Sequence, residues 1–194
     1  MRWMWIDRFV EFVRGTRAQA IKNISLAEFH IDGYLPGCPV FPPPLIIEGL
    51  AQTAGLLAGE MSGFKDRVVL AKISKAVFHF PARPGDSLHY TAVLENVDKD
   101  GAAARGTSRV GGVVQADVEF LFSFHLGDKF ADKSLFDPAD LLRMVRTFGM
   151  YDVGVTQDGQ PLPVPEYMAE AEREANARLE AHYRASMAAT AVGT

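Results

Sequence analysis

The stretch from Gly33 to Gln52 reads GYLPGCPVFPPPLIIEGLAQ, and its two halves differ in composition. Residues 32–44 contain two glycines and five prolines, which neither a helix nor a central strand accommodates. Proline is tolerated in the first helical turn, where its missing N–H has no partner to lose. We therefore expect a loop over residues 32–44 that passes at Pro43 or Pro44 into a helix ending near Met61.

The expected helix is apolar nearly all the way round, which indicates burial on all sides. Small residues keep it narrow enough for a sheet to wrap close to its backbone; these are Gly49, Ala51, Ala54, Gly55, Ala58 and Gly59. Residue patterns predict strands before and after it, over 17–24, 68–78, 88–98, 102–110 and 113–126. The spacing of apolar residues predicts a short amphipathic helix over 3–12. A buried helix followed by an antiparallel meander is typical of the α+β class.

The character of the sequence changes after Asp128. Residues 137–147 predict a short helix, 151–165 an extended linker rich in glycine and proline, and 166–188 a longer helix. We expect a domain over 1–128 and a helical extension over 129–194. The long helix has an apolar stripe too narrow for a core of its own, so we expect it to lie on the main domain or on a partner subunit. The stripe consists of Met168, Ala171, Ala175, Leu179, Tyr183 and Met187.

Charge and composition exclude several classes of function. The net charge of −4 provides no global basic field for nucleic acid or anionic lipid. The single cysteine, Cys38, allows no intrachain disulfide, which fits a cytoplasmic protein. The N-terminus lacks the pattern of a signal peptide. The longest apolar run, residues 42–58, is interrupted by Glu48 and Gln52 and favours a buried helix over a membrane span.

Glu48 is the residue in which we expect chemistry. Apolar side chains surround it in the sequence, and burying an unpaired carboxylate is costly unless the group is paired, protonated or useful. Gln52 lies one turn further on, on the same helical face. The two side chains would position a polar group of a substrate, or Glu48 would simply anchor the preceding loop; the residues alone favour neither interpretation.

The stretch Gly33–Gln52 resembles the signature of the bacterial 3-hydroxyacyl-(acyl-carrier-protein) dehydratases, and its spacing matches without a gap. Residues 71–86, AKISKAVFHFPARPGD, resemble the strand of that family that ends in a Pro-x-x-Pro-Gly-Asp turn. The resemblance covers about residues 1–126. It implies a hot-dog fold, in which an antiparallel sheet wraps round one helix, and a homodimer or larger homo-oligomer.

In that family the active site lies between subunits, and the resemblance implies a site here without metal or cofactor. The substrate would be an acyl thioester of acyl carrier protein or coenzyme A, with its acyl chain in a tunnel beside the helix. A loop histidine and the helix glutamate come from different subunits and share the acid–base work. The catalytic positions here would be Glu48 and Tyr34, and the positions that bind substrate would be Gln52, Gly37, Phe41 and Leu45.

The sequence departs from the family at two positions. Tyr34 replaces the histidine, and a tyrosine with a pKa of roughly 10 donates a proton far more readily than it accepts one. Pro43 replaces a glycine whose backbone N–H would contact the thioester carbonyl, and after Phe41 the first possible donor is Leu45. His30 lies near Tyr34 but is interpreted as an ordinary histidine at a strand end. These departures predict impaired dehydration.

Three functions remain open from the sequence. The first is an acyl-thioester dehydratase of fatty-acid or lipid biosynthesis that uses Glu48 and Tyr34. The second is a module that binds an acyl thioester or carrier protein without catalysis, with Lys72, Lys75 and Arg83 as possible contacts for an acidic carrier. The third is a dimerisation unit in which the C-terminal helices fill the tunnel.

Overall fold

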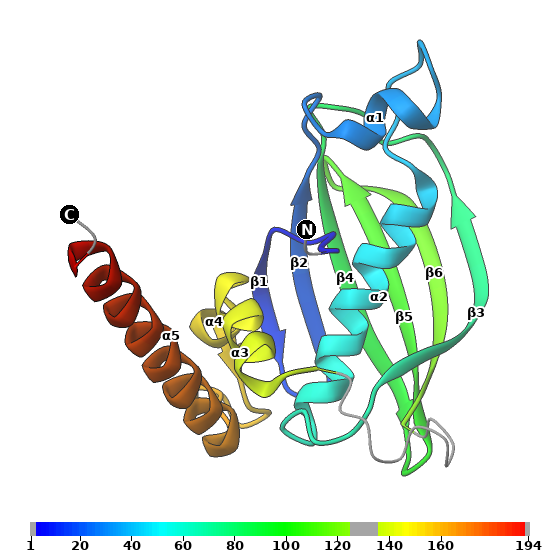
Figure 1. The fold of residues 1–194 in the computed structure, drawn as a ribbon. Coiled ribbons are helices and arrows are strands. Elements are labelled where there is room, and N and C mark those ends of the chain that lie inside the picture. The colour runs from blue at the N-terminus through cyan, green and yellow to red at the C-terminus, as the bar shows by residue number, and fades with distance from the viewer. Residues whose placement is uncertain (1–2, 125–135, 193–194) are drawn as a thin grey trace.

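The computed structural model describes residues 3–124 and 136–192, and in that part of the chain one long helix lies across one face of a seven-stranded sheet (Figure 1). The helix is α2, Pro43–Glu60. The strands are β1 Arg8–Val13, β2 Arg17–Asn23, β3 Val69–Phe78, β4 Ser87–Val97, β5 Gly101–Val110, β6 Val113–Ser123 and β7 Gly154–Val155. Their order is β3-β6-β5-β4-β2-β1-β7, and every pair is antiparallel except β1–β7. The predicted α+β class and the central helix are confirmed.

The sheet packs closely on one face of α2. Leu50, Ala54 and Leu57 are fully buried on that face. At Gly49 the approach is so close that a Cβ atom would lie 2.5 Å from the Tyr90 ring and 2.6 Å from the carbonyl oxygen of Trp5. A glycine is therefore required there, as the predicted narrow helix implies.

The predicted helix over residues 3–12 is wrong, because β1 occupies Arg8–Val13 and pairs with β2. The register shifts between Phe9 and Glu11, so this strand contains a β-bulge. The bulge lets Phe9 and Phe12, three residues apart, both point into the core. That spacing imitates the period of a helix and explains the error.

The predicted loops also hold short elements. Helix α1, Phe29–Tyr34, takes in the beginning of the expected loop over 32–44. Helix α4, Met150–Val153, and strand β7 occupy the beginning of the expected linker over 151–165. Elements of two to six residues are too short for a periodic pattern. Since β7 pairs in parallel with β1, the C-terminal extension is joined to the edge of the sheet.

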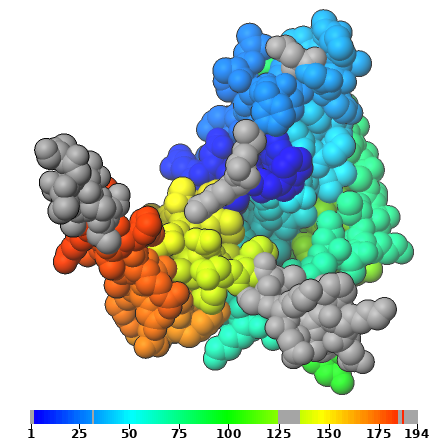
Figure 2. All heavy atoms as spheres, in the orientation of Figure 1, coloured from blue at the N-terminus to red at the C-terminus, as the bar shows by residue number. Residues whose placement is uncertain are grey.

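Two further helices follow, α3 Pro138–Thr147 and α5 Glu166–Val192, and both were predicted. The Asp137 side chain caps α3 by accepting from the backbone N–H of Ala139 and Asp140. Figure 2 shows α3 and α4, in yellow, lying against the N-terminal segment in dark blue, while α5 projects from the body. The boundary predicted between residues 128 and 129 lies outside the described residues.

The first half of α5 packs on the rest of the chain. Met168 is fully buried, and Arg146 of α3 forms an ion pair with Glu172. Leu179 and Tyr183, further along the predicted stripe, are exposed. Within the described part of the chain, no helix is both long and apolar enough to cross a membrane.

Candidate functional site

A groove of about 410 Å³ runs along α2, and the sheet also lines it through Leu70 of β3 and Phe122 of β6. Six residues of α2 line it at helical spacing, namely Glu48, Ala51, Gln52, Gly55, Leu56 and Gly59. The N-terminal segment contributes Trp3 and Met4, and α3 contributes Leu141 and Met144. Glu48 and Gln52 give the lining a polar end at the start of the helix, most of the lining beyond them is apolar, and Asp66 adds one carboxylate past the end of α2. The helical extension forms a wall of the groove and leaves it open.

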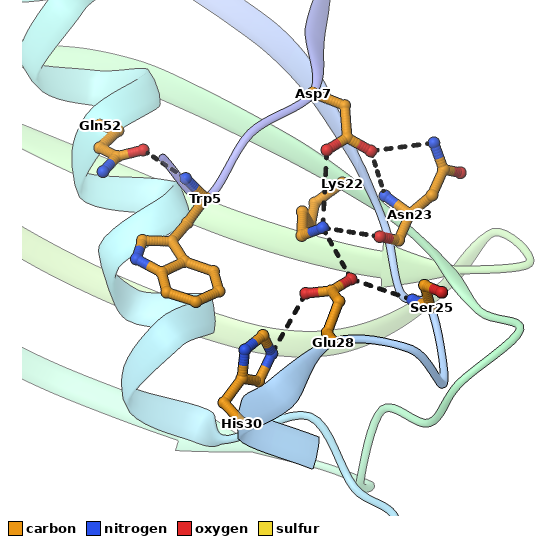
Figure 3. A network of polar contacts seen from close by, with 8 residues as sticks. All are labelled: Trp5, Asp7, Lys22, Asn23, Ser25, Glu28, His30 and Gln52. Atoms are coloured by element: carbon orange, nitrogen blue, oxygen red, sulfur yellow. Dashed lines mark hydrogen bonds and ion pairs between the residues drawn. The ribbon is translucent and has the colours of Figure 1, made fainter. Parts of the chain in front are cut away.

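Hydrogen bonds fix the two polar side chains of the groove. The Gln52 Oε1 atom accepts from the backbone N–H of Trp5 at 2.9 Å (Figure 3), and the Gln52 Nε2 atom donates to the carbonyl oxygen of Trp3 at 2.9 Å. Because these partners decide which way the amide points, Nε2 also donates to Glu48 Oε1, at 2.9 Å. Glu48 makes no ion pair with any described residue. Gln52 therefore orients the Glu48 carboxylate without neutralising it.

The start of α2 offers no spare backbone donor between Phe41 and Leu45. The N–H of Phe41 donates to the carbonyl oxygen of Ala82 at 2.8 Å, and that of Leu45 donates to the carbonyl oxygen of Pro42 at 2.9 Å. The three prolines between Phe41 and Leu45 have no N–H. The sequence predicted that Pro43 has no N–H to offer a thioester carbonyl, and in the structure the N–H groups of Phe41 and Leu45 on either side of the prolines are also engaged.

The other four predicted site residues are not among the residues that line this groove. Tyr34 ends α1 and is 48% exposed, and within one chain it is not brought to Glu48. Gly37 adopts a positive φ of 75° in the turn that follows α1. Phe41 is buried in the core, and Leu45 is partly buried against it. Of the predicted site residues, Gln52 is the one whose side chain is hydrogen-bonded to Glu48 within the described chain.

His30 lies in α1, so the prediction that it lies at a strand end is wrong. Its Nε2 atom is 3.2 Å from Glu28 Oε2, and its ring packs edge-on against Trp5 and Phe41 at centroid distances of 4.9 and 5.3 Å. Glu28 also contacts Lys22, at 3.0 Å (Figure 3). Burial lowers the pKa of His30 and outweighs the opposing effect of Glu28. His30 therefore supports α1 and the segment that orients Gln52.

Sequence reasoning missed two sets of residues at the site, the backbone atoms that hold Gln52 and the side chains that α3 adds to the groove. Trp3 and Trp5 act through their backbone atoms, which no side-chain pattern could reveal. Leu141 and Met144 come from beyond the region of family resemblance, and the apolar residues spaced three and four apart within 137–147 are the signal that could have found them. Among the described residues, no group of three histidine, cysteine or carboxylate side chains could hold a metal ion.

Comparison with known proteins places residues 2–124 in a family described as the FabA-like domain. The 3-hydroxyacyl-[acyl-carrier-protein] dehydratase FabZ of Caldanaerobacter subterraneus subsp. tengcongensis is 34% identical over 121 residues, which is 62% of this chain and 86% of that protein. FabZ of Nitratiruptor sp. is 42% identical over 95 residues, 45% of this chain and 64% of that protein. FabZ of Paracidovorax citrulli is 37% identical over 123 residues, 61% of this chain and 84% of that protein.

Solved structures agree on the fold. The dehydratase heterocomplex ApeI:P from Xenorhabdus doucetiae superposes with a TM-score of 0.55 at 13% identity, over 74% of this chain and 90% of that one. An uncharacterised protein from Pyrococcus horikoshii gives 0.52 at 12% identity, over 66% and 88%. At such identities the likeness concerns the fold alone, a helix wrapped by an antiparallel sheet. The family match over residues 2–124 and the identity with FabZ show that this chain belongs to the FabA-like family of 3-hydroxyacyl-[acyl-carrier-protein] dehydratases, and the solved structures show that it has the hot-dog fold.

Proposed function

We propose that this protein interconverts 3-hydroxyacyl and trans-2-enoyl thioesters, with Glu48 as the acid–base group. The observation that carries the proposal is the position of Glu48 at the polar end of an apolar groove, oriented by Gln52 and paired with no described cation. An acyl thioester has the matching distribution, with a polar reacting end and an apolar chain. The relatives named FabZ are dehydratases of such substrates on acyl carrier protein.

The chemistry requires one group to remove a proton from C2 and one to protonate the leaving hydroxyl at C3. In the proposed reaction the Glu48 carboxylate takes the C2 proton, and the electron pair of that bond forms the C2–C3 double bond. The C3–O bond breaks, and the oxygen leaves as water after accepting a proton. Tyr34 of a second subunit is suited to donate it, because a phenolic hydroxyl is a proton donor.

A homodimer would complete this site. Strand β3 lies at an edge of the sheet and pairs only with β6 among the described strands, so its outer edge is available for a second copy to continue the sheet. The exposure of Tyr34 also suits a residue that acts across a subunit boundary. We place the reaction in cytoplasmic fatty-acid or lipid biosynthesis, with acyl carrier protein or coenzyme A as the carrier.

A non-catalytic module that binds acyl thioesters is the second candidate. It is favoured by the start of α2, where the N–H groups of Phe41 and Leu45 are already hydrogen-bonded and three prolines lie between them. A thioester carbonyl would find no backbone donor there to stabilise developing negative charge. Tyr34 in place of a histidine points the same way, because it removes the group that titrates near neutrality.

The deciding experiment is hydration of a trans-2-enoyl coenzyme A thioester, followed by loss of the enoyl absorbance. We expect turnover by the natural protein and a loss of about 10²-fold or more in Glu48→Gln, the magnitude typical of removing a general acid–base group. The matched control is Glu95→Gln, whose carboxylate pairs with Arg105 at the surface of the sheet. Equal turnover by the natural protein and Glu48→Gln would refute the assigned role.

The double variant Tyr34→His with Pro43→Gly separates the two candidates. If the natural protein is inactive and the double variant hydrates the thioester, the scaffold is intact and the natural protein is a binding module. If both are active and both lose activity on Glu48→Gln, the enzyme works without the usual histidine.

A further inference from the structure

The C-terminal extension forms one wall of the groove, although it lies outside the residues that match the family. Leu141, Met144 and Phe148, spaced three and four residues apart, present one side of α3 and its end to the groove. The backbone N–H of Phe9 donates to the carbonyl oxygen of Phe148 at 2.8 Å, which ties this wall to β1. The wall is therefore a fixed part of the molecule and a feature added to the family core.

The floor of the groove is smooth because small residues recur along α2. Ala51, Gly55 and Gly59 follow one another at intervals of four residues and cover roughly 12 Å of the helix at 1.5 Å per residue. A Cβ atom at Gly55 would meet only the Phe122 ring, at an ordinary contact distance of 3.6 Å. The glycine here is not forced by close packing, and its effect is to leave space in the groove.

Phe64 lies at the far end of this floor in a costly conformation. Its φ of 61° makes it the one described non-glycine residue with a positive φ, and for a bulky side chain this is an outlier. Its N–H donates to the carbonyl oxygen of Gly59 at 2.8 Å, and its ring would lie 3.1 Å from a Cβ atom at Gly59. Strain of this kind persists where the surroundings impose it, often at a ligand site.

Four residues line both the groove and a second hollow of about 760 Å³ beyond it, namely Phe64, Asp66, Phe136 and Leu141. The second hollow is bounded by Arg14, Lys65 and other residues at the junction with the extension. Residues that line two neighbouring hollows stand between them. Phe64, which follows α2, and Leu141 of α3 are the two apolar residues of the folded core and of a helix at this boundary, and they therefore separate the groove from the next space together with Asp66 and Phe136.

We propose that the groove holds the acyl chain of the thioester and that Phe64 and Leu141 form its blind end, so that the C-terminal extension sets the longest chain the protein accepts. This inference rests on the proposed function for the identity of the ligand. Each methylene that a longer chain buries contributes about 0.8 kcal/mol, or about fourfold in affinity. A chain that reaches the blind end gains nothing from further methylenes.

The test uses trans-2-enoyl coenzyme A thioesters with short, medium and long chains, and measures both hydration and calorimetric binding. Phe64→Gly, which also relieves the positive φ, and Leu141→Ala remove the blind end. We expect each to extend the preferred chain length, with about fourfold tighter binding for each added methylene. Gly55→Leu places a large side chain on the floor of the groove and is expected to shorten the preferred chain length. The matched control is Leu142→Ala, a buried residue of the same helix that does not line the groove, which is expected to leave the length profile unchanged.

The two readouts separate the inference from the function on which it rests. Hydration with one length profile in all variants would overturn the role of Phe64 and Leu141 and leave the dehydratase intact. Binding with a shifted profile, but no hydration by any variant, would support the blind end and refute catalysis. Neither binding nor hydration of any chain by the natural protein would overturn both.

Discussion

Helix α2 carries two carboxylates, Glu48 near its start and Glu60 at its end, and the structure treats them in opposite ways. Glu60 is 1% exposed, and the Arg14 guanidinium clamps it with hydrogen bonds from Nε to Oε2 at 2.9 Å and from NH2 to Oε1 at 2.5 Å. Glu48 is half-buried, borders a groove and receives a hydrogen bond from the neutral amide of Gln52. One carboxylate is a structural ion pair and the other is available to a ligand.

The sequence left open whether Glu48 positions a polar group of a substrate or anchors the preceding loop, and the contrast with Glu60 favours the first interpretation. Both glutamates lie among apolar residues of one helix, so composition gives them the same environment. What separates them is a cation from a distant turn, because Arg14 lies between β1 and β2 and reaches Glu60 across the fold. A buried carboxylate with such a partner serves the structure. A carboxylate without one, at the edge of a groove, is a candidate for chemistry.

The largest effect on stability is expected from Arg14→Ala. It leaves the Glu60 carboxylate buried without its cation. Breaking a fully buried pair in this way costs about 3–5 kcal/mol of unfolding free energy, and because the Arg14 side chain is 34% exposed we expect a loss near the lower end of that range. Urea denaturation measures the loss. Arg17→Ala, which removes an ion pair between exposed Arg17 and Glu11, is the control and should cost under about 1 kcal/mol.

The double variant Arg14→Met with Glu60→Leu should recover most of that loss, because replacing both partners with apolar residues removes the uncompensated charge. Recovery would confirm that Glu60 is purely structural. If the double variant stayed as unstable as Arg14→Ala, the pair would have a role beyond its own charges, and the contrast with Glu48 would weaken.

Smaller changes in the free energy of unfolding are expected when Gly49 or Gly55 is replaced by alanine, and the two changes should have opposite signs. Gly49→Ala places a methyl group against the Tyr90 ring and the carbonyl oxygen of Trp5, and such overpacking costs about 1–3 kcal/mol. Gly55→Ala meets no close contact and should stabilise the helix by about 0.5–1 kcal/mol. Thermal unfolding of both variants measures the difference. Equal destabilisation at the two positions would mean that the groove face is packed like the sheet face.

The features that the sequence predicted depend on residues close together in the chain, and the features that it missed depend on residues far apart in the chain. The helix over Pro43–Glu60 and the pairing of Glu48 with Gln52 followed from local signals, namely three prolines, an apolar run and a spacing of one turn. The clamp on Glu60, the backbone atoms that orient Gln52 and the wall formed by α3 all depend on contacts between residues 46 or more apart in sequence. No local pattern encodes such contacts, and the bulge in β1 even gave a misleading one.

The smallest expected effect concerns His30, whose neighbour is the carboxylate of Glu28. Burial lowers the pKa of His30 below its ordinary value, Lys22 adds to the lowering, and Glu28 opposes both. As the pH falls through about 6.5, the unfolded chain takes up the proton first, so this group makes the folded state lose stability in acid. His30→Phe keeps the edge-on packing against Trp5 and Phe41 and should flatten the profile. Urea unfolding at a series of pH values above about 5, where carboxylates stay ionised, measures the slope. If the natural protein instead gained stability as the pH falls through this range, the ion pair with Glu28 would outweigh burial. His30 would then be half of a structural ion pair, as Glu60 is.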